Sequence, residues 1–183
     1  MKDNTRTKIL EPSSGQAFHL RSPTVQDASA LWRLVRNSGV LDLNSPYSYL
    51  MLCSHFAATC LVAEEDGAIV GFVTAYRPPT APDVIFVWQI GVAQAARGKG
   101  VGLTILDALV RKQTALGASF LEATVTPSNA PSRKLFRALA RRFHTQCVET
   151  PCFPAHLFPE AAHEAEELFR IGPFGQDLRV KTD

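Results

Sequence analysis

The spacing of apolar residues predicts a chain in which strands and amphipathic helices follow one another. Short apolar runs rich in β-branched and aromatic residues are typical of strands, and apolar residues that recur at i, i+3 and i+4 are typical of helices. The predicted strands cover residues 17–21, 60–63, 69–76, 84–92, 120–126, 143–150 and 168–171. The predicted helices cover residues 24–39, 45–58, 102–117, 128–139 and 160–167. Together these elements indicate a mixed α/β protein.

Capping and turn residues support several of these boundaries. The first helix is expected to begin at Thr24, with Asp27 in the acidic position of a capping box, and to end at Gly39. The second and third predicted strands are joined by an acidic connection that ends in Asp66-Gly67. An Asp-Gly pair between two apolar runs predicts a tight hairpin.

The second predicted helix begins at Ser45 and has a proline at the next position, which is tolerated in a first helical turn. One face of this helix is lined by Tyr47, Leu50, Met51, Ser54 and Ala58. We interpret Tyr49 and Met51 as packing residues rather than as contacts with a ligand.

Length, composition and charge narrow the class of protein. The chain has 183 residues, 46% of them hydrophobic, and a formal net charge of +2. At about 150 residues per domain this length favours one domain, which we place at residues 17–174, between a flexible arm at 1–16 and a tail at 175–183. The balanced charge argues against binding nucleic acid through a broad basic face. No apolar run approaches the roughly 18 residues of a membrane span, so we expect no membrane association.

The polar start of the chain lacks the apolar core of a secretory signal. The four cysteines are scattered, so we interpret them as reduced thiols in a cytoplasmic protein. The five histidines do not pair with cysteines or carboxylates at ligand spacing, and we therefore predict no metal site.

The strongest chemical signal is a glycine-rich turn between a predicted strand and a predicted helix. It reads Gln89-Ile90-Gly91-Val92-Ala93-Gln94-Ala95-Ala96-Arg97-Gly98-Lys99-Gly100-Val101-Gly102. A helix start leaves about four backbone N–H groups without partners and carries partial positive charge. Glycines let the backbone close around an anion, and Arg97 and Lys99 add formal charge, so the turn suits a diphosphate. The spacing matches neither a P-loop nor the G-x-G-x-x-G of a Rossmann turn.

Arg97, Gly100 and Gly102 instead form R-x-x-G-x-G, which resembles the coenzyme A loop of the GNAT N-acetyltransferase superfamily. A later segment, from Asn129 to Phe136, resembles the superfamily's N-x-x-[SA]-x-x-L-[YF] motif. The resemblance implies the GNAT fold, an α/β (α+β) arrangement with a mixed, mostly antiparallel twisted sheet of about six to seven strands flanked by about four to five helices. It also implies acetyl-CoA as co-substrate. The implied contacts with acetyl-CoA are Ile90, Gly91, Val92, Arg97, Gly98, Lys99, Gly100, Val101, Gly102, Asn129 and Ser132.

The same resemblance implies a mechanism. The fourth strand diverges from the fifth, and a backbone N–H in the gap, near Ile90 and Val92, polarises the thioester carbonyl. A neutral amine then attacks directly, without a covalent intermediate on the enzyme. Many family members have a tyrosine that protonates the leaving thiolate, but this chain has Phe136 at that position, so no general acid is assigned. The alternative role for Asn129 is that of a plain helix cap, and this role is compatible with a contact to acetyl-CoA.

Residues 40–63 lie where this fold usually builds its acceptor site, and they are similar to the L-2,4-diaminobutyrate acetyltransferases of ectoine biosynthesis. Residues 86–92 and 121–129 are similar to the same enzymes, and the resemblance covers about residues 17–174. It implies transfer of an acetyl group to the 4-amino group of L-2,4-diaminobutyrate, for osmoprotection. It also implies a homodimer.

A diamino acid carries two ammonium groups, so its site needs carboxylates and other hydrogen-bond acceptors. The candidate acceptor-binding residues are Asp42, Asn44, Ser45, Tyr47, Trp88, Asn129, His163 and Glu166. Because the attacking amine must lose a proton, Glu166, His163 and Asp42 are the catalytic candidates. The helix predicted over residues 160–167 would place His163 and Glu166 one turn apart. The alternatives are a capping residue for Asp42, a core residue for Trp88 and a solvated helix face for the glutamates.

Other functions stay open on the sequence alone. A related enzyme of the same fold would act on another small amine or on a peptide amine. A non-catalytic acyl-CoA-binding domain is a further alternative, suggested by Phe136 in the usual tyrosine position.

Overall fold

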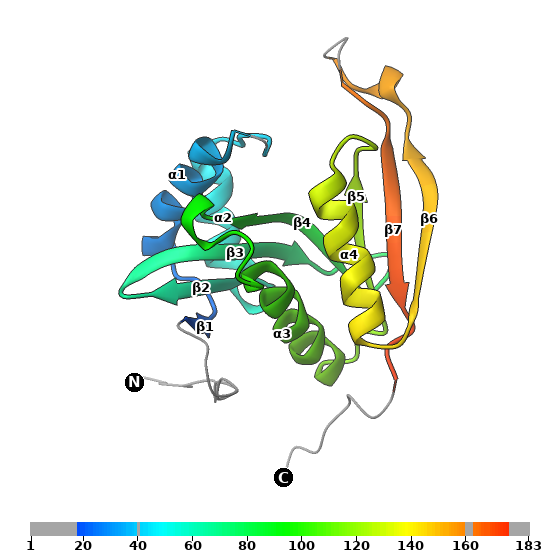
Figure 1. The fold of residues 1–183 in the computed structure, drawn as a ribbon, viewed down its shortest axis with the longest axis horizontal. Coiled ribbons are helices and arrows are strands. Elements are labelled where there is room, and N and C mark those ends of the chain that lie inside the picture. Colours follow the sequence, from blue (N-terminus) through cyan, green and yellow to red (C-terminus); the bar gives the residue numbers. More distant parts are fainter. Residues whose placement is uncertain (1–17, 40, 160–162, 176–183) are drawn as a thin grey trace.

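The computed structural model describes residues 18–39, 41–159 and 163–175. Seven strands form one mixed sheet in the order β1-β2-β3-β4-β5-β7-β6 (Figure 1). The strands are β1 (His19–Arg21), β2 (Leu61–Glu65), β3 (Ala68–Tyr76), β4 (Val84–Val92), β5 (Phe120–Val125), β6 (Gln146–Phe153) and β7 (Glu166–Gly172). The α-helices of the described residues are α1 (Ala28–Ser38), α2 (Pro46–His55), α3 (Val101–Ala115) and α4 (Ala130–Arg142). Single 3-10 turns lie at Val25–Asp27, Ala57–Thr59, Gln94–Ala96 and Ala155–Leu157. The predicted α/β class and the GNAT fold are confirmed.

The sheet opens between β4 and β5. Every other neighbouring pair of strands is antiparallel, but β4 and β5 run parallel and pair only from Val84 to Phe86 on β4. Beyond Phe86, β4 pairs with β3 alone, up to Val92. The predicted divergence of these strands is therefore confirmed, and it leaves backbone groups of β4 available to a ligand.

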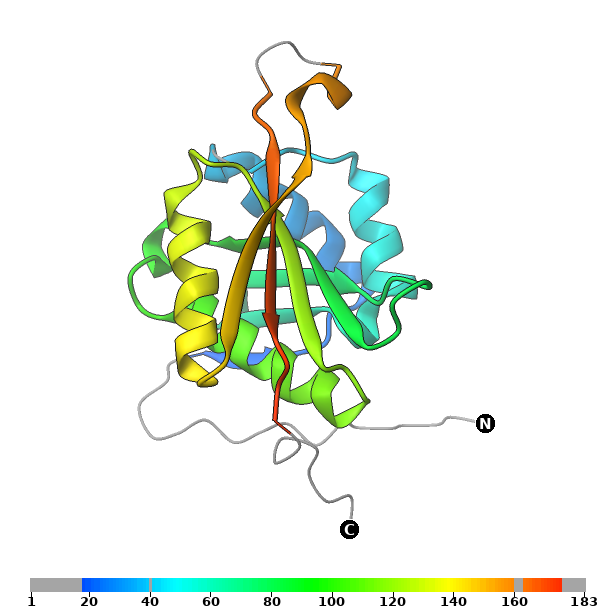
Figure 2. The same ribbon diagram turned by 90° about the vertical axis from the view of Figure 1, so that its right-hand side faces the viewer.

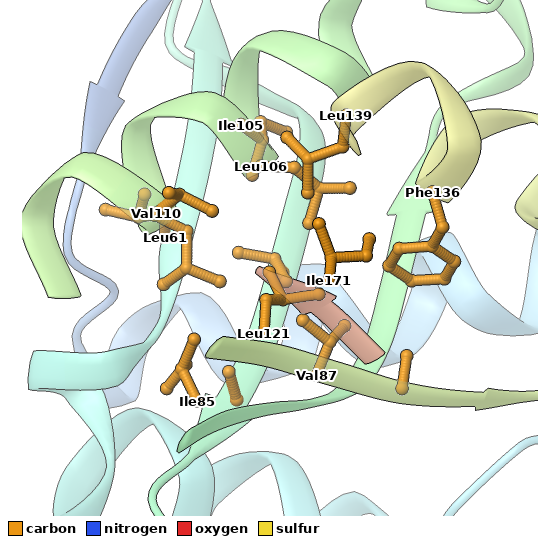
Figure 3. Close-up of a cluster of buried hydrophobic side chains, with 14 of the residues drawn as sticks. Leu61, Ile85, Val87, Ile105, Leu106, Val110, Leu121, Phe136, Leu139 and Ile171 are labelled. Carbon is orange, nitrogen blue, oxygen red and sulfur yellow. The ribbon is translucent and has the colours of Figure 1, made fainter. Parts of the chain in front are cut away.

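Helices cover both faces of the sheet, and each pair of helices encloses its own apolar core. Successive residues of a strand point to opposite faces. On β3, Val73 belongs to the cluster under α3 and α4, whereas Phe72 belongs to the cluster under α1 and α2. Figure 3 shows the first cluster, in which Leu106, Leu121 and Ile171 are fully buried. Each such side chain stabilises the fold by about 1.5–3 kcal/mol relative to exposure.

Several local predictions hold in detail. The backbone N–H of Thr24 donates to the Asp27 carboxylate at 2.7 Å, as expected of a capping box. Gly39 ends α1 in the left-handed conformation, with φ of 69°. Asp66 and Gly67 both have positive φ, which gives the tight turn of the β2–β3 hairpin.

The predicted packing of α2 is partly wrong. Tyr47, Leu50 and Met51 are exposed, and Tyr47 retains 73% of its accessible surface. Tyr49 and Cys53 are buried instead, so the interpretation of Tyr49 as a packing residue is right and that of Met51 is wrong. Apolar residues lie on both sides of this helix, so their periodicity alone did not select the face that packs on the sheet.

The helix predicted over 160–167 is also wrong wherever the structure describes that segment. Residues 163–165 are irregular, and Glu166 begins β7. β7 pairs with β5 on one side and β6 on the other, and these two ladders outweigh the helical preference of the glutamates. β6 and β7 extend past α4 and carry the 3-10 turn at Ala155–Leu157 (Figure 2).

The arm predicted at 1–16 and all but the first residue of the predicted tail lie outside the described residues. The four cysteines are free thiols, as expected. Within the described ranges, the helices are too short or too polar to cross a membrane.

Candidate active site

Two adjoining cavities open at the gap between β4 and β5. We call them the glycine-loop cavity, of about 830 Å³, and the acidic cavity, of about 750 Å³. The residues that line both are Leu41, Ile90, Thr126, Asn129 and Ser132. Ile90 belongs to β4, and Asn129 caps α4, so the junction of the cavities lies where the strands separate. Two ligands, one in each cavity, would meet at this junction.

The glycine-loop cavity is built around the start of α3. Gly98 and Gly100 adopt φ of 77° and 79°, a conformation that costs residues with a Cβ about 1–2 kcal/mol. The Thr104 N–H makes a helical bond to the Gly100 carbonyl at 3.0 Å. The N–H groups of residues 101–103 precede that bond and lie at the positive end of the helix. This end of α3 therefore suits an anion such as a diphosphate.

Basic side chains add positive charge to this cavity. Arg97 and Lys134 line it, and its described lining contains no Asp or Glu. The Arg97 Nε donates to the Val92 carbonyl at 3.3 Å, which links the glycine turn to the end of β4. Lys134 was missed at the sequence level, although it lies in the α4 motif that supplied Asn129 and Ser132.

The acidic cavity has the opposite charge. Its described lining includes Asp42, Glu164 and Glu166, and no Lys or Arg. Glu164 accepts a hydrogen bond from the Ser128 N–H at 3.1 Å, which ties it to the turn before α4. Carboxylates in a partly enclosed cavity favour a ligand with ammonium groups.

Aromatic residues form the remaining walls of the acidic cavity. Trp88 lines it and is 52% exposed, so it is a wall residue rather than a core residue. The His163 ring stacks on Phe158 with 3.7 Å between centroids. Phe153, Leu157 and Phe158 come from the end of β6 and its 3-10 turn, and the sequence had not singled them out for the site.

Glu166 has the environment of a proton acceptor. Its Oε2 is buried and has no hydrogen-bond partner among the described groups. Burial raises the pKa of Glu166, and the negative charges of Asp42 and Glu164 raise it further, against opposing effects of Thr124 and His163. A carboxylate with a raised pKa and a free oxygen in a cavity is suited to take a proton from a bound amine.

Comparison with known proteins decides the family. Residues 27–140 match the model of the acetyltransferase (GNAT) family. The chain belongs to the GNAT family. It is 53% identical to the L-2,4-diaminobutyric acid acetyltransferase of Halalkalibacterium halodurans, over 82% of this chain and 79% of that protein. It is 44% identical to the L-2,4-diaminobutyric acid acetyltransferase of Bordetella parapertussis, over 91% of this chain and 90% of that protein.

Solved structures of GNAT proteins have the same fold as this chain. The diaminobutyrate acetyltransferase EctA from Paenibacillus lautus, in complex with L-2,4-diaminobutyric acid and coenzyme A, matches with a TM-score of 0.83 and 41% identity. The match covers 88% of this chain and 98% of that one. A putative acetyltransferase from Salmonella typhimurium with acetyl-CoA has a TM-score of 0.67 at 16% identity, over 86% of this chain and 94% of that one, and shows the fold alone.

The GNAT fold brings most of the predicted site residues to the two cavities. Ten of the residues predicted to contact acetyl-CoA line the glycine-loop cavity: Ile90, Gly91, Val92, Arg97, Gly98, Gly100, Val101, Gly102, Asn129 and Ser132. Six of those predicted to contact the acceptor line the acidic cavity: Asp42, Asn44, Trp88, Asn129, His163 and Glu166. His163 and Glu166 do so without the predicted helix, from the irregular segment and the start of β7.

Three predicted residues are not brought to the cavity linings. Lys99 is exposed on the glycine turn, and Tyr47 is exposed on α2. The Ser45 hydroxyl lies 3.2 Å from the Ser48 hydroxyl, outside the acidic cavity. The Asn129 side chain accepts a bond from the Ser132 N–H at 3.1 Å, so it caps α4 while it also lines both cavities.

The departure from the GNAT tyrosine is visible in the structure. Phe136 lines the acidic cavity and is only 2% exposed, with its ring centroid 6.0 Å from that of Phe169. A phenyl ring at this position offers no proton to a leaving group. It belongs instead to the apolar cluster under α3 and α4.

Glu166→Gln is expected to stabilise the folded protein at pH 7. The pKa of Glu166 is higher in the folded than in the unfolded chain, so ionisation lowers stability as the pH rises through that interval. Urea denaturation at about pH 7 and about pH 4 measures the effect. The gain should shrink at the lower pH, where the wild-type carboxyl is largely protonated in both states. An equal gain in stability at both pH values would contradict this explanation.

Proposed function

We propose that this chain transfers the acetyl group of acetyl-CoA to the 4-amino group of L-2,4-diaminobutyrate, giving N4-acetyl-L-2,4-diaminobutyrate. The observation that carries the proposal is the meeting of two oppositely charged cavities at Ile90, Asn129 and Ser132. The basic cavity suits the diphosphate of one substrate, and the acidic cavity suits the ammonium groups of the other. The names and bound ligands of the relatives support the same pair of substrates.

On the donor side, the residues fit coenzyme A. Gly98 and Gly100 take positive φ and have open space where a Cβ would stand, so an anion can approach the backbone. Arg97 and Lys134 supply charge for the diphosphate. The edge of β4 beyond Phe86, which lacks a strand partner on the β5 side, offers hydrogen bonds to the rest of the molecule. One N–H on this edge would stabilise negative charge on the thioester oxygen.

On the acceptor side, the chemistry starts with the loss of a proton. The 4-ammonium group has an alkyl-amine pKa near 10, so it must be deprotonated before it can attack. Glu166 takes this proton, with Asp42 and Glu164 available to the other ammonium group. The amine nitrogen then bonds to the carbonyl carbon, the carbon–sulfur bond breaks, and the nitrogen loses its second proton to water. The sulfur leaves as a thiolate and is protonated from water, because Phe136 has no proton to give.

A thiol-release assay tests this function. The purified chain is mixed with acetyl-CoA and L-2,4-diaminobutyrate, and free coenzyme A is followed with a thiol reagent. We expect turnover with this amine, and much lower turnover with lysine and with peptides that carry a free N-terminus. Release with another amine but not this one would remove the substrate assignment. Binding of acetyl-CoA in calorimetry without any turnover would favour the non-catalytic alternative.

We also propose that the chain is a cytoplasmic homodimer, as the family resemblance implies. The free thiols support a reducing compartment. Exposed apolar side chains on α2, including Leu50 and Met51, offer a surface that a second copy would cover. Sedimentation at micromolar concentration tests the dimer, and a single monomeric species would contradict it.

A further inference from the structure

A hydrogen-bond network joins the loop before α2 to β4. The Tyr49 hydroxyl donates to the Gln89 Oε1 at 3.0 Å, and the Gln89 Nε2 donates to the Asp42 carbonyl oxygen at 2.8 Å. The loop that carries Asp42 and Asn44 into the acidic cavity is therefore tied to a strand and to a helix.

The bond between Tyr49 and Gln89 is buried, so it is stronger than a surface contact, and the bond from Gln89 to the Asp42 carbonyl is half-buried. Tyr49 is fully buried and Gln89 is 8% exposed. A carbonyl oxygen can only accept, so the Asp42 carbonyl fixes which end of the Gln89 amide faces it. The other end is then an acceptor for the Tyr49 hydroxyl. Both polar atoms of the Gln89 side chain are therefore hydrogen-bonded, and the side chain connects the loop to α2.

A β-bulge in β4 turns the Gln89 side chain toward this loop. Thr74 pairs with Gln89, but Ala75 pairs with Val87, so Trp88 is an extra residue in β4. Val87 belongs to the core under α3 and α4, and a regular strand would point Gln89 to the same face. The extra residue reverses the alternation, and Gln89 instead reaches Tyr49 in the core under α1 and α2.

We infer that Gln89 and Tyr49 are positioning residues for acceptor binding, which hold the Asp42–Asn44 loop so that its side chains face the acidic cavity. The inference rests on the proposed function for the identity of the acceptor. Gln89 also lines the acidic cavity, but both polar atoms of its side chain are bonded within the protein, and Tyr49 does not line the cavity. Both residues therefore act on the acceptor through the loop. The glycine-loop cavity is formed by other residues, so binding of coenzyme A should not depend on the network.

Gln89→Leu and Tyr49→Phe test the inference by their effects on the two substrates. Gln89→Leu removes both bonds at similar size, and Tyr49→Phe removes only the hydroxyl. We expect the KM for diaminobutyrate to rise by about 10- to 50-fold in the first and about 3- to 10-fold in the second, since the loss of one hydrogen bond has an effect of about 3- to 10-fold. The KM for acetyl-CoA should stay within about twofold. Cys53→Ala, a buried change on α2 outside the network, controls for general loosening and should leave both values unchanged.

A double-mutant cycle separates positioning from simple destabilisation. If Gln89 acts through Asp42, the effect of Gln89→Leu should shrink to less than about threefold in an Asp42→Asn background. If the two substitutions raise the KM for diaminobutyrate independently, so that their fold-changes multiply, this result would overturn the inference. So would an equal rise in KM for both substrates.

Hydrogen exchange provides a readout that does not depend on the substrate. Amide exchange of residues 41–45 should accelerate in Gln89→Leu, while exchange across α3 stays unchanged. If the wild type fails to acetylate diaminobutyrate but the loop still loosens in the variant, the proposed function fails and the positioning of the loop stands. If exchange of the loop is unaltered, the network does not hold it and the inference fails.

Discussion

Replacing Glu166 with Gln is expected to lower kcat for acetylation of diaminobutyrate by about 10²–10⁴-fold, the usual range for loss of a general base. Glu166 has a buried, unpartnered carboxylate oxygen in the acidic cavity, and glutamine cannot take a proton there. Steady-state kinetics with saturating acetyl-CoA measure the loss. The dissociation constant of coenzyme A should not change, because the glycine-loop cavity does not include this residue.

The pH dependence of activity and a matched control variant test whether the lower kcat comes from loss of the general base. Activity of the wild type should fall as the pH drops below the raised pKa of Glu166, and the variant should lack that limb. Glu149→Gln removes a carboxylate from neighbouring β6, where it pairs with Arg133 and Arg137, and it should leave kcat unchanged. A Glu166→Gln enzyme within about threefold of wild type would show that another group takes the proton, with His163 as the next candidate.

Gly100→Val should weaken binding of coenzyme A by about 10- to 100-fold. Gly100 is the N-cap of α3 with φ of 79°, a conformation that β-branched residues strongly disfavour. Valine would rotate the turn and misdirect the N–H groups that face the diphosphate. Calorimetric titration with coenzyme A measures the affinity directly, without the acceptor.

Gly117→Val provides the matched control. Gly117 follows α3 with φ of 95° and also has open space around it, so valine imposes comparable backbone strain there. It lies at the opposite end of the same helix, outside both cavities. The control should lose stability but retain coenzyme A affinity. Equal loss of affinity in both variants would mean that general destabilisation, not the loop, explains the effect.

The sequence predicted the parts of the site that local chemistry determines. The glycine turn was identified because strand, glycines and helix start follow one another along the chain. β4 was predicted at its observed bounds, Val84–Val92, because β-branched and aromatic residues fill it. The acceptor candidates Asp42 and Asn44 came from the resemblance to the family, and the structure places both in the acidic cavity.

What the sequence did not reveal depends on pairing between distant strands. Glutamates in the segment before β7 favour a helix locally, and only the ladders to β5 and β6 make Glu166 the start of a strand. The bulge at Trp88 is a mismatch between two strands, so no single-strand pattern shows it. Gln89 was therefore seen only as the first residue of the glycine segment, and its contact with Tyr49 of α2 was missed.

The position of the acetyl group on the product tests the central claim most directly. The chain is incubated with acetyl-CoA carrying a ¹³C-labelled acetyl group and with L-2,4-diaminobutyrate, and the product is examined by NMR. The account predicts one labelled amide, on the 4-amino nitrogen, formed in equal amount to the coenzyme A released. Label on the 2-amino nitrogen would contradict the proposed acceptor group, and hydrolysis of acetyl-CoA without any amide would contradict transfer between substrates in the two cavities that meet at Asn129.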